Sequence, residues 1–339
     1  MADVATALSA VLEGSYTLPT AVDVGQPHRY IIFSDQHKGA GDDADEFRPC
    51  ATTYAAALNW YLKENYTLIL LGDVEELWEQ GFRAVERAHR GILELEGSFP
   101  AGRYFRVWGN HDDEWMDDRQ VRRLLSPYLP TNAVYEAIRV EVFDNGVHLG
   151  TLLLVHGHQG TFGSDKIRWL SCKALRIYRY FQRATGVGQT TPAKDACLRS
   201  EHDKKMYEWA AAQDNLILIA GHTHTPVWSS RTHLQKLEAD LATLLGRPRS
   251  PETETAIAAK KIEVEDRLIK SPPCGETQKA VPCYFNTGSC RFADGDITGV
   301  EIENGVMRLV KWSSGDMSVA RRVLEEDAVA GIFARLRKA

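Results

Sequence analysis

Residues 30–37 read Tyr-Ile-Ile-Phe-Ser-Asp-Gln-His, an apolar run that ends in an acid and a histidine. Such a run is typical of a buried strand, and polar residues just after it lie where open sheets form active sites. Three further blocks follow comparable runs: Gly72-Asp73, His156-Gly157-His158 and Gly221-His222-Thr223-His224. The block Gly109-Asn110-His111-Asp112 follows residues 104–108, which alternate less cleanly. The sequence therefore predicts polar side chains gathered where several strands end.

The five blocks supply carboxylate, amide and imidazole groups but no cysteine. This donor set suits two divalent ions in positions that water can reach. Any single block is weak evidence, because a histidine at a strand end is more often a hydrogen-bonded structural residue than a ligand. The ordered set of five predicts a functional centre.

Strands and helices are predicted to alternate in the first third of the chain. Apolar periodicity predicts strands at 30–34, 67–71 and 103–108, with helices near 45–64 and 82–96. Two hairpins follow, with turn signals at Asp144-Asn145-Gly146 and Glu303-Asn304-Gly305. Mixed sheets flanked by helices fit an α/β class fold with the layers of an αββα sandwich.

In this order the blocks resemble the signature of the calcineurin-like metallophosphoesterase superfamily, from residue 31 to residue 224, with a closing strand at 284–289. The resemblance implies a four-layer αββα sandwich of two mixed sheets and two metal ions, with Mn²⁺ expected first and Fe²⁺ or Zn²⁺ as alternatives. One ion is expected to take Asp35, His37 and His224. The other is expected to take Asn110, His156 and His222, while Asp73 bridges both.

The same resemblance places His111 where the family has a residue that contacts the scissile phosphate and helps the leaving group depart. The chemistry agrees, because a water held between two ions about 3.5 to 4 Å apart yields a hydroxide nucleophile near neutral pH, and an imidazole can donate a proton to an alkoxide. The alternative is that His111 only orders its loop. His158 competes with His156 for the ligand position if both lie on one extended strand; we favour His156 and assign His158 and Asp112 to a supporting or substrate-contacting role.

Within the superfamily the chain is more similar to bacterial UDP-2,3-diacylglucosamine hydrolases. Residues 72–78, Gly-Asp-Val-Glu-Glu-Leu-Trp, look like their second motif, and they also carry a helical insertion between the fourth and fifth blocks. Two positions depart from their pattern: His111, where those enzymes usually have arginine, and the Lys38-Gly39 continuation of the first block.

Length and composition fit one catalytic domain over residues 1–339 with insertions at 159–214 and 229–279. The chain is 44% hydrophobic, and its net charge of -6 argues against general nucleic-acid binding. Its six cysteines form no Cys-x-x-Cys pair, which favours reduced thiols in the cytoplasm. No signal peptide or apolar run of about 20 residues is present.

Both insertions are predicted to be helical. In the first, residues 166–183 place apolar side chains on one face and Arg176, Arg179 and Arg183 roughly opposite. This basic face is either simply solvated, or it contacts an acidic ligand or an anionic membrane surface, which would make the protein peripheral to a membrane. In the second, Leu234, Leu237, Leu241 and Leu244 form a helical stripe, and a further helix is predicted from Ser250-Pro251 toward Lys270.

Together these features predict a dinuclear metal-dependent phosphoesterase that hydrolyses a phosphate ester or pyrophosphate bond with a metal-bridged hydroxide and His111. The open substrate classes are a nucleotide-linked glycolipid pyrophosphate, a small phosphomonoester or phosphodiester, and a nucleic acid. The alternative to an enzyme is a non-catalytic binding scaffold of the same fold.

Overall fold

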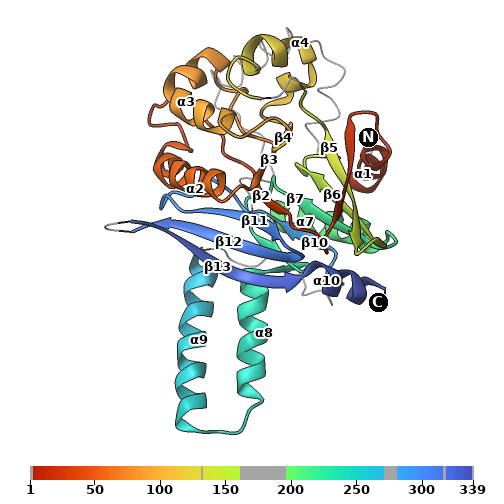
Figure 1. Ribbon diagram of the computed structural model, residues 1–339. Coiled ribbons are helices and arrows are strands. Elements are labelled where there is room, and N and C mark those ends of the chain that lie inside the picture. Colours follow the sequence, from red (N-terminus) through yellow and green to blue (C-terminus); the bar gives the residue numbers. More distant parts are fainter. Residues whose placement is uncertain (1–2, 131–132, 161–195, 271–280, 316–317, 338–339) are drawn as a thin grey trace.

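A computed structural model of the chain describes residues 3–130, 133–160, 196–270, 281–315 and 318–337. It has four layers, in which two β-sheets lie face to face and helices cover the outer face of each (Figure 1). The predicted αββα sandwich is therefore confirmed.

Within the described residues the first sheet has seven strands in the order β1-β5-β6-β7-β10-β8-β9. Their bounds are β1 Thr17–Asp23, β5 Ala137–Asp144, β6 Val147–Val155, β7 Leu216–Ala220, β10 Tyr284–Asn286, β8 Val227–Trp228 and β9 Arg231–Thr232. The β6, β7 and β10 strands run parallel to one another, so their carboxyl ends meet at one edge of the sheet.

The second sheet has six strands in the described residues, in the order β13-β12-β11-β2-β3-β4. Their bounds are β13 Val319–Ala328, β12 Val306–Ser314, β11 Ile297–Glu303, β2 Arg29–Phe33, β3 Thr67–Leu71 and β4 Tyr104–Val107. The β2, β3 and β4 strands are parallel, whereas β11, β12 and β13 form an antiparallel meander. Every residue of β3 is buried, as expected for a parallel strand covered on both faces.

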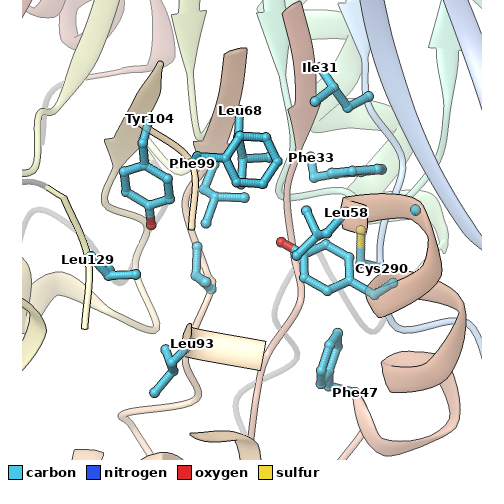
Figure 2. Close-up of a cluster of buried hydrophobic side chains, with 14 of the residues drawn as sticks. Ile31, Phe33, Phe47, Leu58, Leu68, Leu93, Phe99, Tyr104, Leu129 and Cys290 are labelled. Atoms are coloured by element: carbon cyan, nitrogen blue, oxygen red, sulfur yellow. The ribbon is translucent and has the colours of Figure 1, made fainter. Parts of the chain in front are cut away.

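Three apolar cores separate the layers. The outer face of the second sheet packs on α2 (Ala51–Lys63) and α3 (Phe82–Gly97), with Ile31, Phe33 and Leu68 among the buried side chains that Figure 2 shows. The outer face of the first sheet packs on α1 (Val4–Leu12) and α7 (Ala196–Ala211). Between the sheets lies a third core that also receives α10 (Val329–Leu336).

Short helical turns complete the body. They are the 3-10 helices Arg48–Cys50 and Asp113–Met116, the helix α4 at Asp118–Gln120, and a π-helical turn at Val121–Leu125. The predicted helix near 45–64 begins late, because Asp45 accepts hydrogen bonds from the backbone amides of Gly41 and Phe47 and so holds residues 41–47 in a loop.

The second insertion forms a helical hairpin of α8 (His233–Leu245) and α9 (Pro251–Lys270) that projects away from the sheets (Figure 1). The two helices share a small apolar seam of Leu237, Leu241 and Val264. At the base of the hairpin the Ser230 hydroxyl donates to the Val281 carbonyl at 2.6 Å, so the two ends of the insertion lie side by side. Of the first insertion, residues 161–195, including the predicted basic helix, lie outside the described residues.

Candidate metal centre

Loops that follow β2, β3, β4, β6 and β7 carry all seven predicted metal ligands. The backbone ties the first two loops together: the Asp35 amide donates to the Gly72 carbonyl at 3.1 Å and the His37 amide to the Asp73 carbonyl at 2.9 Å. Parallel strands end at one edge of their sheet, and the His222 amide, which donates to Asp35 Oδ2 at 3.0 Å, joins the loops of the two sheets there.

One group of ligands consists of Asp35, His37 and His224. His224 Nε2 lies 3.0 Å from Asp35 Oδ1 and 3.3 Å from His37 Nε2. A second group consists of Asp73, His156 and His222, in which His156 Nε2 lies 3.0 Å from Asp73 Oδ2. Asp73 Oδ2 also lies 3.6 Å from His37 Nε2, so this carboxylate stands between the two groups.

Asn110 belongs to the loop that closes over Asp73. The amide of the next residue, His111, donates to Asp73 Oδ1 at 2.8 Å. In the described part of the chain, no group forms a hydrogen bond with the buried Oδ1 of Asn110 or Nε2 of His222. Buried polar atoms are nearly always paired, so two unpaired atoms beside these carboxylates fit a pair of metal ions.

Hydrogen bonds to the outer ring nitrogens orient two of the histidines. His156 Nδ1 lies 2.9 Å from the Leu71 carbonyl oxygen, and His37 Nδ1 lies 2.9 Å from Glu76 Oε2. A carbonyl oxygen and a carboxylate accept hydrogen bonds and cannot donate them, so both rings carry a proton on Nδ1, and Nε2 is the nitrogen that would bind a metal ion.

The ligand loops adopt an uncommon backbone conformation. Five of the seven expected ligands have φ between 50° and 69°: His37 at 50°, Asp73 at 51°, Asp35 at 54°, His224 at 56° and His222 at 69°. Residues other than glycine rarely adopt this left-handed region, and such strain gathers at functional sites. The close approach also explains Gly72, where an added Cβ would lie 2.6 Å from the His156 ring.

Charge in the centre is fixed by its buried neighbours. Burial raises the pKa of Asp73, but His156 and His111 outweigh this effect and hold that pKa well below its usual range. Burial lowers the pKa of His156, yet Asp73 and Asp35 raise it to about 9, so a metal ion that binds at Nε2 would displace a proton. Burial lowers the pKa of His224 to about 4 despite Asp35. The carboxylate of Asp73 is therefore ionised at neutral pH, the form that binds cations.

Glu76 is a site residue that the sequence analysis did not single out. Its carboxylate lies 2.9 Å from His37 Nδ1 and 2.8 Å from His111 Nδ1, and the Trp78 ring stacks on His111 with centroids 4.2 Å apart. Burial lowers the pKa of His111, but Glu76 and Asp73 raise it to about 9. Glu76 lies three residues after Asp73 in the quoted segment 72–78, which is the signal that could have identified it.

A model of the calcineurin-like phosphoesterase family matches residues 28–228, more than half of the chain and a span that holds every ligand loop. The chain belongs to this family. No curated protein sequence matches it.

This calcineurin-like phosphoesterase is also similar to several solved structures. Vacuolar protein sorting 29 from Cryptosporidium parvum has 12% identity and a TM-score of 0.33, covering 89% of this chain and 98% of its own. A predicted phosphoesterase from Streptococcus pneumoniae has 12% identity and a TM-score of 0.31, with 88% and 98% covered. A single mutant of vacuolar protein sorting 29 from Entamoeba histolytica has 13% identity and a TM-score of 0.33, with 87% and 98% covered.

Asp112 supports the backbone of the ligand loops. Its buried carboxylate accepts from the amides of Gly109 at 2.6 Å, Val74 at 2.9 Å and Asp73 at 3.3 Å. It thereby joins the loop after β4 to the loop after β3.

Behind Asp112 lies a buried ion network that the sequence analysis did not foresee. Arg106 pairs with Asp112 at 3.2 Å and with Glu75, while Lys38 Nζ lies 2.7 Å from Glu96 and 3.6 Å from Glu75. The side chains of these five residues are fully buried. Lys38, which departs from the pattern of UDP-2,3-diacylglucosamine hydrolases, therefore points into the protein and supports the loops.

His158 is buried outside both ligand groups, with its ring centroid 5.5 Å from that of His156 and 5.0 Å from that of Trp108. The two histidines do not share an extended strand, since β6 ends at Val155 and Gly157 has φ of 108°. Arg176, Arg179 and Arg183 lie outside the described residues. Among the described helices, none combines the length and apolar composition needed to cross a membrane.

Proposed function

We propose that this chain is a dinuclear metal-dependent phosphoesterase that hydrolyses a phosphate ester or pyrophosphate bond. Membership of the calcineurin-like phosphoesterase family supports metal-dependent phosphoester hydrolysis in general. The observation that carries the dinuclear proposal is the position of Asp73, 3.6 Å from His37 in one ligand group and 3.0 Å from His156 in the other. A carboxylate in this position suits a bridge between two cations.

In this proposal Asp35, His37 and His224 hold one ion, and Asn110, His156 and His222 hold the other. The bound ions would polarise the phosphate and activate water. Oxygen, amide and imidazole ligands suit Mn²⁺, Fe²⁺ and Zn²⁺. Mn²⁺ remains the first expectation because of the family resemblance, with Fe²⁺ and Zn²⁺ as alternatives.

His111 would contact the phosphate and assist departure of the leaving group. Glu76 and the Trp78 ring hold its imidazole from two sides, and its backbone amide is held by Asp73. Such double support fixes the direction of a ring that must reach a substrate atom. Glu76 in turn connects His111 to the ligand His37, so one carboxylate positions both rings.

For the substrate class we propose a nucleotide-linked glycolipid pyrophosphate. The likeness of residues 72–78 to UDP-2,3-diacylglucosamine hydrolases supports this proposal, as does the predicted basic helix with Arg176, Arg179 and Arg183. Those enzymes usually have arginine at the position of His111, so we expect the phosphate contact in this chain to differ from theirs. Replacing the three arginines by glutamine should weaken binding to anionic vesicles at low salt. Unchanged vesicle binding would remove the membrane contact from the proposal.

The deciding experiment is an activity screen of the chelator-stripped protein after addition of single metals. The substrates are phosphomonoesters, phosphodiesters and nucleotide-linked pyrophosphates, and the matched control is Asp73→Asn. Hydrolysis that needs metal and Asp73 would support the enzyme, and the favoured substrate would define its class. A protein that binds two ions but hydrolyses none of these bonds would favour the non-catalytic scaffold.

The positioning role of Glu76 has its own test. Glu76→Gln removes the negative charge shared by the two imidazoles, and hydrogen bonds to charged groups contribute about 1.5 to 3 kcal/mol each. We expect kcat, measured at saturating metal, to fall at least tenfold, with a larger loss for esters of poor leaving groups. Glu79→Gln makes the same change at an exposed position nearby and should leave kcat unchanged. Equal losses for good and poor leaving groups would contradict a role through His111.

A further inference from the structure

A cavity of about 200 Å³ lies between the two sheets, away from the ligand loops. Its walls are alternate residues of strands from both sheets, including Leu18, Val22, Ile69, Ile138 and Leu152. Well-packed interiors hold few voids larger than a water molecule. A space of this size inside the inter-sheet core is therefore a candidate binding site.

The cavity has an open end and a closed end. Thr20 and Gly102 at the open end are exposed, and Leu18, Tyr30 and Phe105 are partly exposed. At the closed end Ile32, Ile69 and Leu154 are buried. A ligand can therefore enter from solvent at the edge between β1 and the segment that precedes β4.

The opening faces away from the metal centre. Thr67, which lines the cavity, begins β3, whereas Asp73 follows the end of that strand. The four steps along β3 from Thr67 to Leu71 span ~13 Å. The cavity is thus separate from the site where hydrolysis is proposed, although its closed end at Leu154 lies two residues before the ligand His156.

The lining determines the chemistry of the occupant. None of the described residues that line the cavity is charged, and most are aliphatic. The polar side chains are Thr20, Thr67 and Tyr30, and the Tyr30 hydroxyl can form a hydrogen bond with a bound molecule. Burial raises the pKa of Tyr30, so this hydroxyl stays protonated and can donate. An apolar tail with one uncharged polar group fits these walls, whereas a carboxylate or phosphate finds no cation.

The dimensions favour a single chain. An apolar cavity of about 150 Å³ stays dry and takes a ligand as large as benzene. This cavity is somewhat larger, and its lining extends from Leu18 to Val22 along β1, a length of ~13 Å. The exposed Thr20 lies midway along this stretch, so the opening is a slit beside β1, and a short chain lying along the strand fits the space.

We propose that this inter-sheet cavity binds the hydrocarbon tail of a neutral single-chain amphiphile, with the polar end of the ligand near the Tyr30 hydroxyl. The site is distinct from the metal centre, and its occupancy does not depend on hydrolytic activity.

Calorimetric titration of the full chain with 1-octanol tests the proposal. We expect saturable binding of one molecule per chain, and at least tenfold weaker binding of octanoate because no cation lines the cavity. Val140→Phe fills the cavity and should abolish binding, whereas Val147→Phe makes the same change at an exposed position and should preserve it. Tyr30→Phe should weaken 1-octanol binding about fivefold through loss of one hydrogen bond.

Three results would overturn the proposal: no saturable binding to the wild-type chain, binding to Val140→Phe as tight as to wild type, or octanoate bound as tightly as 1-octanol. If Val140→Phe fails to fold, the comparison of wild type with Tyr30→Phe and the ratio of 1-octanol to octanoate affinity decide. Equal affinity in both comparisons would then refute a neutral site at Tyr30.

Discussion

Lys38→Met should destabilise the protein strongly although it removes no metal ligand. Lys38 is fully buried, and its Nζ lies 2.7 Å from Glu96 Oε1 and 3.6 Å from Glu75 Oε1. Methionine keeps most of the volume but leaves Glu96 with the Tyr54 hydroxyl at 3.1 Å and no cation. Glu75 keeps Arg106 as its partner, so the loss falls mainly on one buried carboxylate.

Removing one partner of a buried ion pair costs about 3 to 5 kcal/mol, because the other charge stays buried without compensation. Since only Glu96 loses its cation, we expect about 3 kcal/mol at pH 7. With an m value of ~3 kcal/mol per M in urea, this corresponds to a midpoint lower by ~1 M. Circular dichroism during urea denaturation measures this shift.

Two controls separate the ion pair from a general effect of the substitution. Lys63→Met removes an exposed lysine and should change the free energy of unfolding by less than about 0.5 kcal/mol. Lys38→Met combined with Glu96→Gln removes both charges and should recover most of the loss. A single variant within about 1 kcal/mol of wild type, or a double variant that loses the sum of the two single effects, would refute the reasoning.

Asp73→Asn should reduce bound metal from two ions to fewer than one per chain, as elemental analysis would show; two retained ions would exclude the bridge. Gly109→Ala should lower metal content similarly, because its Cβ would collide with the Asp73 carboxylate. Burial raises the pKa of Asp45, but His89 and the Gly41 amide outweigh this and lower it. Asp45→Asn should therefore destabilise at pH 7, with a deficit that is complete above the usual aspartate pKa of 3.8 and shrinks as the pH falls below it; a pH-independent deficit would contradict this. Burial raises the pKa of the Cys50 thiol to about 12 and that of Cys283 to about 11, so neither should react with iodoacetamide at pH 8 before unfolding, which peptide mass spectrometry can follow.

Apolar runs made the central strands predictable. The segment Thr67–Leu71 is buried on both faces, so four consecutive aliphatic residues mark it without any knowledge of its neighbours. The strand β1 gave no such signal, because it is an edge strand with three exposed residues and Pro19 within it. Its pairing with β5 joins residues more than a hundred positions apart.

Some residues of the candidate site were likewise predictable from the sequence, and others were not. Residues such as Asp35 and His224 were predicted because their types and order form a pattern along the chain. Glu76 was missed because its role arises only when the loops after β2 and β4 bring His37 and His111 to one carboxylate. Lys38 and Glu96 were also missed, since charged residues are ordinarily expected at the surface and only tertiary structure places this pair together in the interior.

The hydrogen bond between Ser230 and Val281 has a consequence for how this protein can vary. Because Ser230 and Val281 lie beside each other, a two- or three-residue turn could connect these positions directly, with the loss of the two-residue edge strand β9. The α8–α9 hairpin can then be shortened, lengthened or deleted while β8 and β10 keep their pairing at Val227 and Asn286. A change in the length of this insertion therefore leaves the loops that carry His222 and His224 in place.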